Sequence, residues 1–261
     1  MKSLIEWLNS EETRKLRKIS IRRMLEQVFL RDPMRTIYYD PEIMYSPVDG
    51  TVLYVHEKIN PNDEVVDIKG KIYNLKKILE DENYNSPSIV IGIFLSFFDV
   101  HMSRIPTNGF VKVRSVDPIV TNNLSMRDME NEILKQIVHP KRFKRSLEFL
   151  YYNQRDIVEV VHPLGFKYYV VLIADQEVNA NVFMIDEDGE FVNQGDRIAI
   201  IRYGSLGELV IPLDNKIEFE CLLKSPKKTE DFVHVEAGID PLIRIKSKRK
   251  MLGNNFLKEV R

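Results

Sequence analysis

Three residue types that can activate a nucleophile lie on three separate segments of this sequence. Gly204-Ser205 follows an apolar run, Asp49 stands in the segment Ser46–Gly50, and His101 follows Asp99 and Val100 at the end of a second apolar run. A serine hydroxyl is a poor nucleophile until a base takes its proton, and a carboxylate can orient that base. With glycine on its N-terminal side, Ser205 could attack its own peptide bond, so the sequence predicts an activated serine with self-cleavage as one outcome.

His101 is the predicted base for this chemistry. The chain has five histidines, and His101 alone stands in a short motif at the end of a predicted buried strand, where a rigid element can aim it. Two carboxylates could orient its ring, Asp49 and Asp99. Asp99 shares the face of His101 if the segment is extended, at about 7 Å, which is long for a direct hydrogen bond.

Strand-like segments dominate the chain after residue 40. Apolar or alternating runs bounded by Gly, Pro and Asn predict strands. They lie at Gly50–His56, Ser88–Leu95, Gly109–Arg114, Ile157–Val161, Lys167–Ala174, Asn181–Ile185, Arg197–Tyr203 and Glu208–Pro212. The pair at 157–174 reads as a hairpin around His162–Gly165, and the charged segment Asp128–Tyr152 as a helix or loop covering the sheet. We therefore expect a mainly β, α+β protein, with an antiparallel sandwich or barrel-like catalytic domain at 40–261.

The first 39 residues have a different pattern and are expected to form a helical extension. Apolar residues recur at mostly helical spacing, and six bases lie between Glu11 and Arg23. One interpretation is a core-packed amphipathic helix with a solvated basic face. The other is an interfacial helix that binds anionic lipid through apolar burial and charge.

Composition excludes several classes of protein. The net charge is −1, which provides no overall field for nucleic acid, and one cysteine, Cys221, allows neither an internal disulfide nor a cysteine-rich metal cluster. No apolar run approaches the roughly 20 residues of a spanning helix, and no signal-peptide core opens the chain. We expect a soluble or peripheral protein without a bound metal.

Four ordered segments resemble the phosphatidylserine decarboxylase proenzymes, in particular their short, single-domain branch. They are Phe29–Arg35, Ser46–Gly50, Asp99–His101 and Gly204-Ser205, and the resemblance runs from about residue 28 to about residue 212. It matches Asp49 to the family's relay carboxylate, with His101 and Ser205 as its partners. Because the family acts on a lipid, the resemblance also favours the lipid-binding interpretation of the N-terminal helices.

The resemblance implies a specific reaction. His101 would deprotonate Ser205, the chain would break between Gly204 and Ser205, and the serine would become a covalent pyruvoyl cofactor, without a metal. That group would act as the electron sink for decarboxylation of phosphatidylserine to phosphatidylethanolamine. The expected partners are the phospholipid, a peripheral membrane surface on the cytoplasmic face, and the two cleaved chains as a heterodimer, with further homo-oligomers left open.

The sequence departs from the family pattern in places that bear on substrate and base. Arg104 stands where long-branch members have a second histidine. If that histidine is the base of self-cleavage in those members, then here either His101 serves both self-cleavage and decarboxylation, or Arg104 adjusts the properties of His101. Asp175 and Glu177 add negative charge near the expected substrate region, and the family's C-terminal turn is only loosely matched at Val233–Asp240.

Two alternatives remain beside the phosphatidylserine decarboxylase interpretation. One is a pyruvoyl-dependent decarboxylase of a soluble amino acid. The other is an uncleaved, non-catalytic β-rich binding module. Cleavage of the chain separates the enzymes from the module, and lipid turnover separates the two enzymes.

Overall fold

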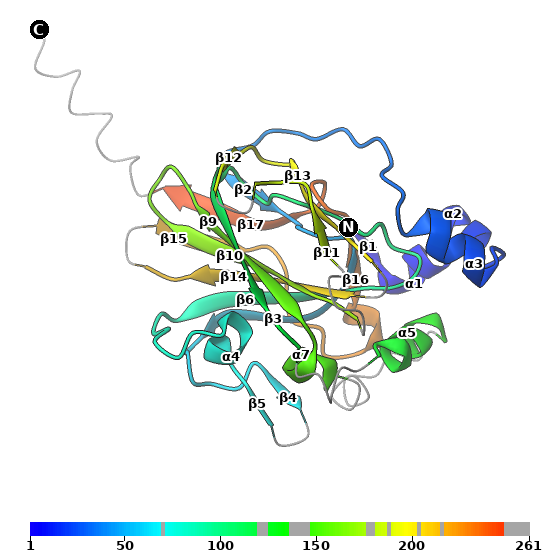
Figure 1. The fold of residues 1–261 in the computed structure, drawn as a ribbon, viewed down its shortest axis with the longest axis horizontal. Coiled ribbons are helices and arrows are strands. Elements are labelled where there is room, and N and C mark those ends of the chain that lie inside the picture. The colour runs from blue at the N-terminus through cyan, green and yellow to red at the C-terminus, as the bar shows by residue number, and fades with distance from the viewer. Residues whose placement is uncertain are drawn as a thin grey trace, which may run out of the picture.

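The structure is a computed structural model of the whole chain (Figure 1). It describes residues 1–68, 71–118, 125–135, 147–175, 181–186, 189–202, 205–214 and 217–247. At Ile21, Leu25, Ser205 and Ser247 the backbone alone is described. Gly204, His139 and the basic C-terminal end lie outside these residues.

A large antiparallel sheet forms the centre of the molecule. Its strand order is β1-β16-β3-β6-β14-β10-β9-β8-β12. These strands are β1 (Lys2–Ser3), β3 (Gly50–Ile59), β6 (Ser88–Leu95), β8 (Gly109–Val116), β9 (Arg155–Val161), β10 (Lys167–Ile173), β12 (Phe191–Val192), β14 (Ser205–Pro212) and β16 (Val233–Val235). In the described part of the chain the two edges do not join, so the sheet is open rather than a closed barrel. The mainly β, antiparallel fold predicted from the sequence is confirmed.

The remaining strands form three smaller sheets. One has the order β11-β13-β7, one the order β15-β17-β2, and one is the pair β4-β5. Their bounds are β2 (Ile43–Tyr45), β4 (Val66–Ile68), β5 (Lys71–Tyr73), β7 (Met102–Arg104), β11 (Asn181–Phe183), β13 (Arg197–Ile201), β15 (Ile217–Cys221) and β17 (Pro241–Ser247).

The helices are short, and most gather on one side of the large sheet. They are α1 (Leu4–Leu8), α2 (Glu11–Leu16), α3 (Ile21–Arg23), the π-helical turn η1 (Met24–Val28), α4 (Leu75–Leu79), α5 (Arg127–Leu134), α7 (Phe149–Tyr152) and the 3₁₀ turn η3 (Thr229–Asp231). In Figure 1, α4, α5 and α7 lie below the large sheet, and the sheets containing β13 and β17 lie above it.

Two hydrophobic cores lie on opposite faces of the large sheet because side chains alternate along a strand. On β6, Val90 and Phe94 enter the core that contains the helices, whereas Ile91, Ile93 and Leu95 enter the core under the small sheets. Burial on both faces explains why the Ser88–Leu95 segment is a continuous apolar run. The central strands are thus held by packing above and below.

The N-terminal segment packs onto this core. Ser3 caps α1, accepting a hydrogen bond from the Glu6 N–H, and β1 pairs with β16. Trp7 is 6% exposed and belongs, with Leu4 and Leu16, to the core on the helical side of the sheet. The apolar side of the segment is therefore internal, as the core-packing interpretation predicts. The boundary at residue 39 stays a prediction.

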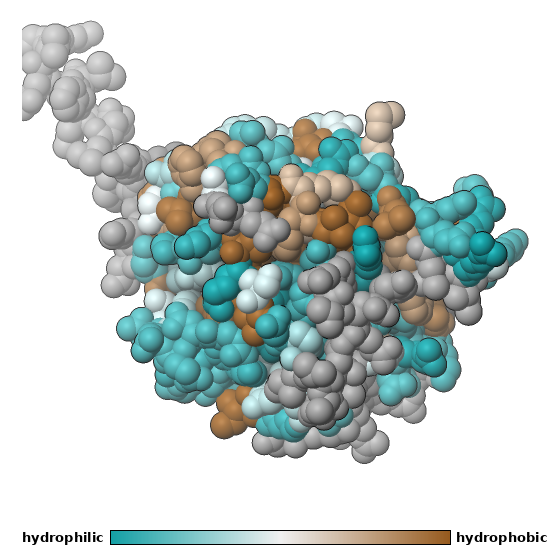
Figure 2. Space-filling view, in the orientation of Figure 1, coloured by the Kyte–Doolittle hydropathy of each residue, from teal (hydrophilic) through white to brown (hydrophobic). Residues whose placement is uncertain are grey.

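The basic side of the same segment faces solvent. Arg14, Arg17, Lys18 and Arg22 are exposed, and Figure 2 shows the α2 and α3 region as a hydrophilic surface. Within the described residues, none of the helices is both long enough and apolar enough to cross a membrane.

Candidate active site

The register of the large sheet brings the separated motifs to one end of neighbouring strands. Thr51 at the start of β3 pairs with Phe94 near the end of β6, and Leu95 pairs with Ser205 at the start of β14. In an antiparallel sheet the start of one strand lies beside the end of its neighbour. The segments that follow Leu95 and precede Thr51 and Ser205 therefore meet at this edge. They carry His101, Asp49 and the predicted cleavage position.

Two contacts place the predicted cleavage position beside the loop Ser96–His101. The N–H of Ile201 donates to the carbonyl of His101 at 2.8 Å, and Ser205 pairs with Leu95 at the other side of the loop. Ile201 and Ser205, on either side of the predicted cleavage position, therefore both contact the segment Leu95–His101. Gly204 itself, and the hydroxyl of Ser205, lie outside the described residues.

His101 is completely buried, and its ring is held on two sides. Its Nδ1 lies 3.0 Å from the carbonyl oxygen of Asp99, and its ring packs edge-on against Phe29 with centroids 4.3 Å apart. A carbonyl can accept but cannot donate, so Nδ1 carries the proton in the neutral ring. Nε2 is then the nitrogen with the lone pair that a general base needs.

Asp49 is also buried, at 3% exposure, and its described partners belong to other segments. Arg35 donates to both carboxylate oxygens, at 2.7 and 2.5 Å, and the N–H of Ala237 donates to Oδ1 at 2.7 Å. Burial lowers the pKa of the Arg35 guanidinium, but the hydrogen bond and charge of Asp49 outweigh it and raise that pKa. On the carboxyl side, burial outweighs the same contacts and raises the pKa of Asp49, so the pair is a buried, bidentate bridge. The predicted relay from Asp49 to His101 stays a prediction.

The described contact between Asp99 and His101 runs through the backbone carbonyl of Asp99. The Asp99 carboxylate instead accepts from His234 Nε2 at 2.6 Å and from the N–H and hydroxyl of Ser96 at 2.7 and 2.8 Å. Burial alone would raise the Asp99 pKa, but these partners outweigh it and lower it. The sequence analysis gave His234 no role. It lies in a three-residue strand 135 positions from Asp99 and has no local motif that could have revealed it.

The lead-in segment Phe29–Arg35 connects the other motifs. Arg31 donates to the carbonyls of Phe98 and Asp99, and Arg35 binds Asp49. Asp32 accepts from Arg104 at 2.9 Å and from Arg197 at 2.6 Å. Arg104, which stands in place of a second histidine, therefore ties β7 to the lead-in. The described hydrogen bonds of its side chain go to Asp32 and to the Gly195 carbonyl.

A polar cavity of about 280 Å³ opens beside these residues. Its lining combines basic residues, acidic residues and aromatic rings. They are Lys2, Arg31, Arg35, Glu12, Asp49, Asp99, Glu236, His234 and Trp7, with Ser10, Pro33, Met34, Phe98 and Val100. Cations and carboxylates side by side suit a zwitterionic group such as an amino acid headgroup better than a simple anion. A cavity of this kind beside Asp49 and Asp99 is the candidate substrate site.

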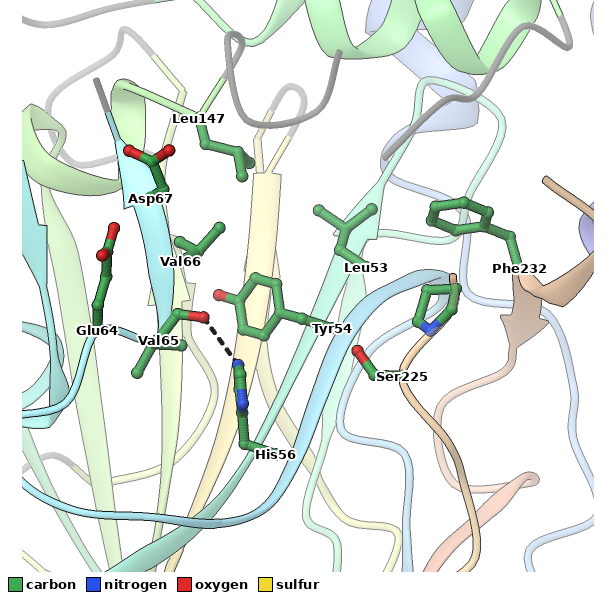
Figure 3. Close-up of a pocket in the computed structure, with 11 residues that line it drawn as sticks. Leu53, Tyr54, His56, Glu64, Val65, Val66, Asp67, Leu147, Ser225 and Phe232 are labelled. Atoms are coloured by element: carbon green, nitrogen blue, oxygen red, sulfur yellow. Dashed lines mark hydrogen bonds between the residues drawn. The ribbon is translucent and has the colours of Figure 1, made fainter. Parts of the chain in front are cut away.

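A second pocket, of about 290 Å³, lies away from these motifs (Figure 3). Leu53, Val66, Leu147 and Phe232 give it an apolar wall, and His56 Nε2 contacts the Val65 carbonyl at 2.7 Å inside it. Its described lining includes neither Asp49 nor Asp99, which both line the polar cavity, and His101 is in the described lining of neither. We therefore assign the chemistry to the polar cavity.

Of the two acidic residues predicted near the substrate region, the structure describes Asp175, which is not among the residues that line the polar cavity. Asp175 accepts from the N–H of Met126 at 2.9 Å, next to α5. On α5, Glu130 is 2% exposed, and burial, with the charges of Asp175 and Asp99, raises its pKa to about 9. Glu130 is therefore neutral near pH 7. Glu177, the other predicted acidic residue, lies outside the described residues.

Comparison with known proteins matches this arrangement to an enzyme family. The model of the family described as phosphatidylserine decarboxylase matches residues 26–237, a range that includes the lead-in, Asp49, His101 and Ser205. The protein is thus an enzyme of the carboxy-lyase class. It belongs to the phosphatidylserine decarboxylase family, as the sequence motifs indicated.

Individual relatives are similar over most of the chain. The phosphatidylserine decarboxylase proenzyme of Ehrlichia chaffeensis is 28% identical over 191 residues, which cover 72% of this chain and 66% of that protein. The putative archaetidylserine decarboxylase proenzyme of Methanocaldococcus jannaschii is 29% identical, covering 72% and 79%. That of Methanopyrus kandleri is 28% identical over 219 residues, covering 84% and 81%. The matched segment is thus just under two thirds of the Ehrlichia protein and about four fifths of each archaeal one.

Proposed function

We propose that the protein is a self-processing, pyruvoyl-dependent decarboxylase that converts phosphatidylserine into phosphatidylethanolamine and CO₂. The observation that supports it is that the two ends of the segment Leu95–His101 contact residues on either side of the predicted cleavage position: His101 accepts from the N–H of Ile201, and Leu95 pairs with Ser205. Membership in the family supplies the reaction class. The pyruvoyl group, the cleavage and the choice of phospholipid are parts of the proposal.

In the self-cleavage step, His101 takes the proton of the Ser205 hydroxyl. The Asp99 carbonyl holds Nδ1–H, so Nε2 is the accepting nitrogen. The serine oxygen then attacks the carbonyl carbon of Gly204, the peptide C–N bond breaks, and the proton held by His101 passes to the freed amine, which leaves an ester between the two residues. β-Elimination from this ester releases the carboxylate of Gly204 and leaves dehydroalanine, which one water molecule converts into the pyruvoyl group with loss of ammonia. Complete burial of His101 excludes bulk water, which keeps the proton transfer within the site.

The residues around position 205 fit a pyruvoyl group. Ser205 begins a strand that pairs with β6 on one side and β10 on the other, so this end stays fixed after the bond before it is cut. A pyruvoyl group at this position supplies a carbonyl that withdraws electrons from the substrate carbon that loses CO₂. The polar cavity beside Asp49 and Asp99 binds and orients the headgroup.

The two products of cleavage are expected to remain a heterodimer. The second chain, residues 205–261, contains β14 at the centre of the large sheet, β16 beside β3, and β17 beside β2. Separating the chains would expose Leu206, Leu209 and Val210, all fully buried. Such burial is worth about 1.5–3 kcal/mol for each large apolar side chain, so the interface is stable.

Substrate class is tested by measuring CO₂ release from carboxyl-labelled substrates. We expect turnover of phosphatidylserine in vesicles and none of free serine, because the proposed substrate is the lipid. The control is Ser205→Ala, which should release no CO₂ from either substrate. Turnover of free serine without turnover of the lipid would contradict the proposal and favour a soluble amino acid decarboxylase. Faster turnover of archaetidylserine would keep the serine phospholipid class but change the preferred lipid.

Membrane association through an exposed basic face, formed by α2 and the two residues after it, is a further part of the proposal. Arg14, Arg17 and Lys18 are exposed, whereas the apolar side of the segment is packed in the core. Attraction to anionic lipid, about 1 kcal/mol per base near the surface, would then contribute most of the binding. The proposed location is the cytoplasmic face of a membrane.

Replacing these three bases by Gln should weaken binding to anionic vesicles about a hundredfold, at about 1 kcal/mol per base. Vesicle sedimentation at low and high salt measures the effect, and salt should weaken wild-type binding because it screens surface charge. The matched control replaces Lys58, Lys112 and Lys167 by Gln. These exposed bases lie on β3, β8 and β10 instead of α2. Lys58 and Lys167 stand at the strand ends that are far from the candidate active site. Equal losses in both triple variants would show general charge attraction and contradict a specific basic face.

A further inference from the structure

Asp99 and His234 form a buried carboxylate–histidine pair that the proposed mechanism does not use. His234 Nε2 lies 2.6 Å from Asp99 Oδ1, and the two residues are 3% and 2% exposed. The pKa of Asp99 is lowered, so the carboxylate is ionised, and it accepts the Nε2 proton. A pair of this geometry restricts both partners, because a short, charge-assisted hydrogen bond joins two side chains that are almost fully buried.

Hydrogen bonds hold both the carboxylate and the backbone carbonyl of Asp99. Its carboxylate binds His234 and Ser96, and its backbone carbonyl accepts from His101 Nδ1 at 3.0 Å and from Arg31 Nη1 at 3.0 Å. A residue has two soft backbone dihedrals, so holding the side chain restricts the direction of the carbonyl. The position of His234 therefore limits where the acceptor for His101 can point.

His234 is itself rigidly held. Its backbone pairs with Lys2 on β1 and with Thr51 on β3. Its ring stacks on Trp7 with centroids 4.2 Å apart and an interplanar angle of 9°. Both neighbouring strands and the indole thus fix the ring from which Nε2 reaches Asp99.

We propose that His234 is a positioning residue for His101, acting through Asp99. This rests on the proposed function, in which His101 is the base of self-cleavage. His234 holds the Asp99 carboxylate, Asp99 presents its carbonyl to His101 Nδ1–H, and His101 is left with Nε2 toward Ser205. Loss of His234 leaves a buried carboxylate with Ser96 as its remaining described partner, and the loop that carries His101 shifts.

The first test compares rates of self-cleavage in variants of the full chain. His234→Ala should cleave about tenfold to a hundredfold more slowly, because small misplacements of a catalytic group cost rates of this order. His234→Gln should recover much of the rate, since its amide N–H can donate to Asp99. His162→Ala is the matched control. His162 is also buried and stacked on an aromatic ring, Phe166 at 4.4 Å, but lies in the β9–β10 hairpin.

The control separates positioning from general loss of stability. We expect His162→Ala to lower the melting temperature as His234→Ala does, yet to cleave at the wild-type rate. Equal cleavage rates in the two alanine variants would overturn the proposal. A rate in His234→Gln as low as in His234→Ala would also overturn it, because the donor to Asp99 would then be irrelevant.

A second test does not need an active enzyme. In the uncleaved Ser205→Ala chain, ¹⁵N NMR of the imidazoles should find His101 with its proton on Nδ1, and adding His234→Ala should change that to a mixture of tautomers. An unchanged His101 spectrum would overturn the proposal. If the wild-type chain does not cleave, the proposed function fails, but this measurement still decides the role of His234.

Discussion

Wild-type protein should separate under denaturing conditions into chains of residues 1–204 and 205–261, whereas Ser205→Ala should remain one chain of 30.6 kDa. The hydroxyl of Ser205 is the nucleophile, and alanine removes it while leaving the backbone bonds of β14 to β6 in place. The variant should therefore fold and fail only in cleavage. Intact mass spectrometry measures both outcomes.

A serine at the other end of the same strand pair provides the control for this experiment. Ser88 is buried at the start of β6 and pairs with Pro212 at the end of β14. Ser88→Ala should lose some stability, because the hydroxyl binds Tyr84 and Ser86, but should cleave normally. A wild-type chain that stays intact after long incubation at neutral pH would refute the pyruvoyl hypothesis.

His101→Ala should block cleavage as completely as Ser205→Ala. A base and the nucleophile that it activates act as one unit, so removing either one removes the same step, and the double variant should be no slower than the singles. The control is His56→Gln. His56 also contacts a backbone carbonyl through its ring, at 2.7 Å, but lies in the pocket of Figure 3. Cleavage at a normal rate in His101→Ala would assign the base to another residue.

Asp49→Asn belongs to the same experiment and should slow cleavage strongly without abolishing it. Asp49 binds Arg35 of the lead-in and the N–H of Ala237, so the amide disrupts the buried bridge that joins these segments. Removing one partner of a buried ion pair costs about 3–5 kcal/mol, because the other charge is left unpaired. Cleavage at the wild-type rate in Asp49→Asn would show that this bridge does not support the site.

Strands buried on both faces were predictable from sequence, often to within a residue or two. Ser88–Leu95 is β6 as predicted, and the hairpin around His162–Gly165 is formed by β9 and β10. A long apolar run with a polar turn is local information. The strand β14 was predicted to start at Glu208 but starts at Ser205, because pairing with Leu95 extends it through a segment that reads as a turn.

Short strands and polar pairings were not predictable in the same way. β16 has three residues, and β2, β4, β5 and β7 also have three each, too few to show a period. The partners of Asp49 and Asp99 lie on segments far along the chain, at Arg35, Ala237 and His234. No spacing in the sequence encodes such contacts, because they depend on which strand ends meet at one edge of the sheet.

The sequence by itself determined the class of fold, the family and the residue types available for chemistry. Burial patterns and short motifs involve residues that are close in the sequence, so they can be recognised without knowledge of the fold. Only the tertiary structure decided which residues each carboxylate binds. Asp49 bridges to Arg35 through its side chain, while Asp99 reaches His101 through its carbonyl and His234 through its carboxylate. These pairings follow from strand register, which sets the positions of distant residues relative to one another to within a hydrogen bond's length.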